Sequence, residues 1–74
     1  MAPEASDLRT RILDDLLERV REDLYPSATM LDMIENLLRQ DDEVEQYADV
    51  LFDKVSEETY PSLSLMRRLQ SLVA

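Results

Sequence analysis

The side chains of this sequence with the greatest capacity for chemistry are carboxylates, and five of them recur at intervals of four residues in the second half. An interval of four brings successive side chains to neighbouring positions on a helix. Like charges at this spacing destabilise a helix by roughly 0.2–0.5 kcal/mol per pair. We interpret the series either as a docking face for a basic partner or as a solvated outer face. This acidic ridge consists of Asp41, Glu45, Asp49, Asp53 and Glu57.

The residue types give catalysis little support. The chain has no histidine and no cysteine, so Ser27 and Ser62 lack the base that activates a serine nucleophile. Zinc and iron–sulfur sites lack their usual ligands for the same reason. The cluster Asp41–Glu43 lacks the alternating oxygen ligands and the glycine of a calcium loop. We therefore predict that the protein is not an enzyme and that it has no catalytic residue, cofactor or metal.

Two further pairs of residues are candidates for recognition. Met33 and Val50 are apolar side chains at the edge of, or off, the core face of their helices. Such groups either join into an interface patch or flank a wide core stripe. Arg67 and Arg68 form the only adjacent basic pair, which either orients a partner or lies on a solvated face. The predicted partner-binding residues are Glu45, Asp49, Asp53, Glu57, Val50, Met33, Arg67 and Arg68.

The charge balance restricts the class of partner. Seventeen acidic residues against eight basic ones give a net charge of −9 and a pI near 4.2. This balance opposes binding to nucleic acid and to anionic membrane surfaces. The first residues lack the pattern of a signal peptide, and the apolar runs are far shorter than the ~18 residues of a membrane span. We expect a cytoplasmic protein that binds a basic protein or an apolar helix, with a homo-oligomer as the other possibility.

Four helices are expected to position these residues, because apolar side chains recur at intervals of three and four. Pro26 and Pro61 end the helices before them. The expected caps are Ser6 or Asp7, Ser27, a capping box of Asp42 with Glu45, and Ser62. The expected helices run from Asp7 to about Leu24, from Ala28 to Arg39, from about Glu43, and from about Ser62.

Each expected helix has an apolar stripe that we predict to be buried. The four stripes are Leu8, Ile12, Leu13, Leu16, Leu17, Val20 and Leu24; Met30, Leu31, Ile34, Leu37 and Leu38; Val44, Tyr47, Ala48, Leu51, Phe52 and Val55; and Leu65, Met66, Leu69, Leu72 and Val73.

The second half of the chain repeats the first at an offset of 35 residues. Tyr25-Pro26-Ser27 returns as Tyr60-Pro61-Ser62, and a fixed period of this length is typical of a repeated supersecondary unit. We predict an all-α fold of four short helices, arranged as two tandem helical hairpins packed into a compact bundle. The single domain would span residues 1–74, with a frayed N-terminus (1–6), a first hairpin (7–39) and a second (43–74).

These features together predict a non-enzymatic protein–protein interaction module, such as a small acidic adaptor, regulator or assembly subunit. The alternative is an acidic inhibitor of the immunity or antitoxin type, which would block a basic nucleic-acid-binding site on a partner protein. The two differ in what holds the complex together. Binding through the ridge would weaken steeply with salt, whereas binding through apolar side chains would not.

Overall fold

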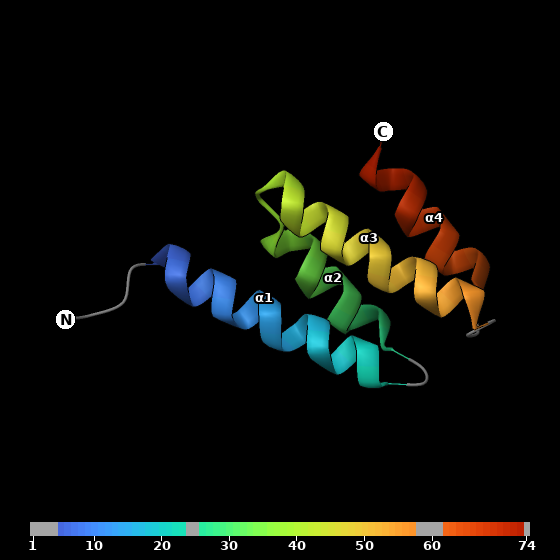
Figure 1. Cartoon of the computed structure of the whole chain (residues 1–74), viewed down its shortest axis with the longest axis horizontal. Coiled ribbons are helices and arrows are strands. Elements are labelled where there is room, and N and C mark those ends of the chain that lie inside the picture. Colours follow the sequence, from blue (N-terminus) through green and yellow to red (C-terminus); the bar gives the residue numbers. More distant parts are fainter. Residues whose placement is uncertain (1–4, 24–25, 58–61, 74) are drawn as a thin grey trace. The chain divides into compact units, whose positions relative to one another are not determined.

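The computed structural model describes residues 5–23, 26–57 and 62–73, and every regular element in these ranges is a helix (Figure 1). The four helices of the described residues are α1 (Ala5–Glu22), α2 (Ala28–Leu37), α3 (Asp41–Ser56) and α4 (Ser62–Leu72). The predicted all-α class is confirmed. Tyr25 and Tyr60, which mark the repeat in the sequence, lie outside the described residues.

The chain divides into two compact units, Met1–Leu38 and Arg39–Ala74. In the first unit α1 packs against α2, and in the second α3 packs against α4. Within each unit the second helix runs in the opposite direction to the first (Figure 1). Among the described residues, no helix combines the length and the apolar character that crossing a membrane requires.

The buried residues of the first unit follow the predicted stripes only in part. Leu13, Leu16, Leu17 and Val20 on α1, and Leu31 and Ile34 on α2, are buried. Each fully buried aliphatic side chain of this kind stabilises the fold by about 1.5–3 kcal/mol. Leu8 and Ile12, which were expected in the same stripe, are exposed. The reason is the face they occupy: Leu13, next to Ile12, is buried, and at about 100° per residue Leu8 and Ile12 lie at the edge of the stripe centred on the buried side chains.

A hydrogen bond from Arg9 connects the two helices of the first unit at the far end from their loop. The Arg9 Nη1 atom donates to the backbone oxygen of Leu37 over 2.7 Å. Leu37 is the last residue of α2, where backbone carbonyls lack partners within the helix and the dipole favours a cation. Arg9 therefore stabilises the C-terminus of α2 and its position on α1.

The N-cap predicted for α2 is correct, and the one predicted for α1 is not. Ser27 is the N-cap of α2, and its hydroxyl accepts a hydrogen bond from the Met30 backbone nitrogen at 3.1 Å, which confirms the predicted cap. The cap predicted for α1 is wrong, because the helix begins at Ala5 and therefore includes Ser6 and Asp7.

The predicted capping box of α3 is also wrong. The helix begins at Asp41, so its third position belongs to Glu43 rather than Glu45. The Glu43 Oε1 atom accepts hydrogen bonds from the backbone nitrogens of Arg39, at 3.0 Å, and Gln40, at 3.1 Å. Glu43 is buried, which fits this role because a buried carboxylate requires partners. It also removes Glu43 from the surface charge of the helix.

Candidate functional site: an apolar groove between α3 and α4

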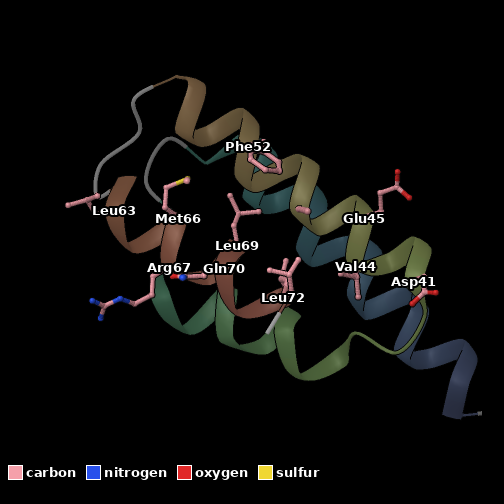
Figure 2. A pocket seen from close by; sticks show the side chains of 12 residues that line it. Asp41, Val44, Glu45, Phe52, Leu63, Met66, Arg67, Leu69, Gln70 and Leu72 are labelled. Atoms are coloured by element: carbon pink, nitrogen blue, oxygen red, sulfur yellow. The ribbon is translucent and has the colours of Figure 1, made fainter.

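The second unit contains a groove of about 740 Å³ between its two helices (Figure 2). Its lining is mostly apolar, with two carboxylates on the α3 side and an arginine and a glutamine on the α4 side. The residues from α3 are Asp41, Val44, Glu45, Ala48 and Phe52, those from α4 are Leu63, Met66, Arg67, Leu69, Gln70 and Leu72, and Val73 follows the end of α4.

The groove exposes apolar side chains to solvent. Phe52 is 54% exposed and Met66 is 45% exposed. Leu63 and Val73, near the two ends of α4, are 84% and 86% exposed. Figure 2 shows Met66 and Leu69 pointing from α4 toward α3, while Leu63 points outward at one end. Phe52, Met66 and Val73 were predicted to be buried, and that prediction is wrong.

The exposure of Phe52 follows from the two apolar stripes that α3 carries. Tyr47 and Leu51 belong to its buried stripe, whereas Val44, Ala48 and Phe52 line the groove. At about 100° per residue, the second stripe lies roughly a third of a turn around the helix from the first. The stripe predicted from the sequence combines these two sets of residues into one. The separate i+4 spacing of Val44, Ala48 and Phe52 was the signal that distinguishes them.

The acidic ridge is exposed along its whole length, but it does not follow one face. All five of its side chains are exposed. Four residues rotate a helix by about 400°, so each step of the ridge drifts by about 40° around α3. Asp41 and Glu45 therefore line the groove, whereas Asp49, Asp53 and Glu57 do not. The ridge begins at the rim of the groove and turns away from it.

The other predicted partner-binding residues are distributed over both units. Arg67 lines the groove, and together with Arg68, Ser64 and Ser71 it lines a second hollow of about 230 Å³ on α4. Met33 is 47% exposed on α2, in the first unit. Val50 was expected off the core face of its helix, but it is only 1% exposed. Val50 stands three residues after the buried Tyr47 and therefore shares its face.

Helix α1 also has carboxylates at intervals of four residues, Asp14, Glu18 and Glu22, but arginines lie among them. The Arg19 Nε atom donates to the Asp15 carboxylate over 2.7 Å, and both side chains are exposed. This hydrogen bond, with the negative charge of Asp15, raises the pKa of the Arg19 guanidinium. Exposed pairs of this kind contribute little to stability. In α3, by contrast, the one basic residue, Lys54, is buried, so no basic group of this helix lies at its surface.

Within residues 5–23, 26–57 and 62–73, no three histidine, cysteine, aspartate or glutamate side chains are grouped so that they would hold a metal ion.

Comparison with known proteins returns no matching family model, no similar curated protein and no similar solved structure. The residues of the groove itself define its chemistry: an apolar surface with an acidic edge on α3 and a basic residue on α4.

The neighbouring residues Leu51 and Phe52 test this description of α3. Because Leu51 is fully buried, we expect Leu51→Ala to lower the free energy of unfolding by about 2–5 kcal/mol. Phe52 is half exposed, so Phe52→Ala should lower it by about 1 kcal/mol or less. Urea unfolding followed by circular dichroism measures both. An equal loss for the two variants would show that Phe52 is a core residue and that the groove is closed.

Proposed function

We propose that this protein is a non-enzymatic protein-interaction module, a small acidic adaptor, regulator or assembly subunit, that binds a partner protein in the groove between α3 and α4. The observation that carries the proposal is the gathering of four exposed apolar side chains along one groove. They are Phe52, Leu63, Met66 and Val73.

The exposed surface of these four side chains adds no hydrophobic stabilisation to the fold, because it stays in contact with water. Scattered exposed apolar residues are normal on a protein surface, but contiguous exposed apolar patches mark interaction sites. Phe52 and Met66 are of the aromatic and methionine types that are enriched at interfaces. Methionine is also flexible and polarizable, so it adapts to the shape of a bound side chain. A protein partner that covers the groove would bury all four apolar side chains at once.

The alternative function, an acidic inhibitor of a basic nucleic-acid-binding site, is favoured by a different observation. The five ridge side chains are exposed while Lys54 is buried. The solvent-facing surface of α3 is thus strongly negative, and such a surface steers and binds basic partners. For this function the important residues are Asp49, Asp53 and Glu57, which lie outside the groove.

We further propose that the two units are the two copies of the 35-residue repeat and pack as a bundle in one domain. Support comes from the similarity of the two units, because each is a pair of helices that run in opposite directions. The size of the chain also supports it, because a unit of fewer than 40 residues seldom buries enough surface to fold alone.

The hydrogen bond of Arg9 provides a test of this single domain. Arg9→Ala should lower the free energy of unfolding by about 1–2 kcal/mol, whereas Arg11→Ala, at an exposed position of the same helix, should have little effect. Native-state hydrogen exchange then shows which helices lose amide protection. In one cooperative domain the slowest amides of α3 and α4 lose the same protection as those of α1 and α2. If protection falls in α1 and α2 alone, the units unfold independently and the proposal of one domain is wrong.

The binding function itself is tested by affinity capture from native lysate with matched variants. Met66 and Met33 are equally exposed, but only Met66 lines the groove. We expect a protein partner to be recovered with the unmodified chain and with Met33→Asp, and to be lost with Met66→Asp. The expected complex resists salt, since its contacts are largely apolar.

Two results would contradict the proposed function. A monomeric chain that recovers no partner would exclude an interaction module. A partner that survives Met66→Asp but is released by moderate salt, and by reversing Asp49, Asp53 and Glu57 to lysine, would instead support the acidic inhibitor.

A further inference from the structure

The shape of the groove restricts what it can bind. Its α3 side extends from Asp41 to Phe52, which corresponds to about 16 Å along the helix, or three turns. Small-molecule sites bury most of their ligand's surface, but this groove is open, with Leu63 and Val73 more than four-fifths exposed near the ends of α4. A long and open apolar groove between two helices fits a third helix, whose own apolar stripe would pack along the groove.

The charges of the groove are unequal on its two sides. Asp41 and Glu45 stand on the α3 side at its first turns, and Figure 2 shows Val44 between them and Leu72 of α4. Arg67 belongs to the middle of α4 and its side chain extends away from α3 in Figure 2, so the positive charge borders the α4 side of the groove rather than one of its corners. A helix in the groove meets negative charge along one edge at one end and a positive charge beside its other edge, nearer the middle.

We propose that the occupant of this groove is an amphipathic helix of about three turns from another protein, with lysine or arginine residues along the edge that meets Asp41 and Glu45. This inference rests on the proposed function and specifies the chemistry of the partner. Basic side chains spaced by four residues on the partner would match the spacing of Asp41 and Glu45. A carboxylate on the opposite edge of the partner helix would complement Arg67.

The net charge argues for another protein rather than a second copy of this chain. Each copy carries a formal charge of −9, so two copies repel each other as they approach. Pairing of Arg67 with a carboxylate of the second copy would offset only a small part of this repulsion, because exposed ion pairs contribute about 0–1 kcal/mol. A partner helix with a basic edge meets no such repulsion and gains favourable contacts with the rim.

Two synthetic peptides test the inference. Both are capped helices of fourteen or so residues, long enough for about three to four turns, with the same leucine stripe at positions i, i+3, i+4, i+7, i+8 and i+11. One has lysines and the other glutamates along the same edge. Fluorescence anisotropy of labelled peptide against the full chain at physiological ionic strength gives the dissociation constants. We expect about tenfold tighter binding of the lysine peptide, since two exposed ion pairs amount to roughly one factor of ten.

Variants of the full chain assign the preference to the groove. Asp41→Lys with Glu45→Lys should reverse the preference, whereas Asp53→Lys with Glu57→Lys, which changes the same charge outside the groove, should reduce it only slightly. Met66→Asp should weaken the binding of both peptides, and Met33→Asp should weaken neither.

The possible results separate this inference from the proposed function. Equal affinity for the two peptides, with loss of both in Met66→Asp, would overturn the basic-edged helix but leave a groove that binds protein. No binding of either peptide would overturn the inference, and a partner captured through Met66 would then still support the proposed function. A dimer seen by sedimentation and abolished by Met66→Asp would identify a second copy as the occupant and overturn the inference.

Discussion

The packing of the short helix α4 against α3 is the constraint on which the site depends. Eleven residues of α4 face sixteen of α3, and the contact leaves Leu65 and Leu69 buried but Met66 in solvent. On α3 the stripe of Val44, Ala48 and Phe52 is one of two apolar stripes. Because one narrow helix cannot cover a surface this wide, a groove remains between the pair. The groove is apolar because α4 alone is too short and narrow to cover both apolar stripes of α3.

Burial and charge are coupled in the same helix. Glu43 and Lys54 are the charged residues of α3 that are buried, and Glu43 is held there by the backbone nitrogens of Arg39 and Gln40. Because both are buried, the charged groups at the surface of α3 are all carboxylates. The drift of about 40° per step along an i+4 series then carries this surface from the groove rim at Asp41 toward the far side of the helix at Glu57. The two proposed functions use different parts of the same series.

The all-α class and the order of the helices could be predicted from the sequence, because the period of apolar residues and the prolines act locally. The start of α2 could be predicted for the same reason, since the Ser27 hydroxyl bonds to a backbone nitrogen three residues away. The start of α3 was misplaced because several acidic residues compete for the capping role, and the choice of Glu43 over Glu45 depends on which of them becomes buried.

The exposed apolar residues could not be predicted from the periodicity. Leu8, Ile12, Phe52 and Met66 all have the spacing of core residues, yet all are exposed. Whether such a residue is covered depends on the length and position of the neighbouring helix, which no local pattern records. Val50 shows the opposite error, because it shares a face with Tyr47 and is buried. Of the residues expected to bind a partner, the groove brings together Glu45 and Arg67, and it adds Phe52, Leu63, Met66 and Val73.

The groove is open to solvent in the isolated protein, and the exposure of its side chains can be measured directly. NMR spectra of the side-chain signals, recorded with and without a soluble nitroxide, report which groups the solvent reaches. We expect the Met66 methyl and the Phe52 ring to be broadened as strongly as the exposed Met33 methyl, while Leu51 and Ile34 are protected. Protection of Met66 and Phe52 equal to that of Leu51 would show that the chain itself fills the groove, which would leave no open site for a partner.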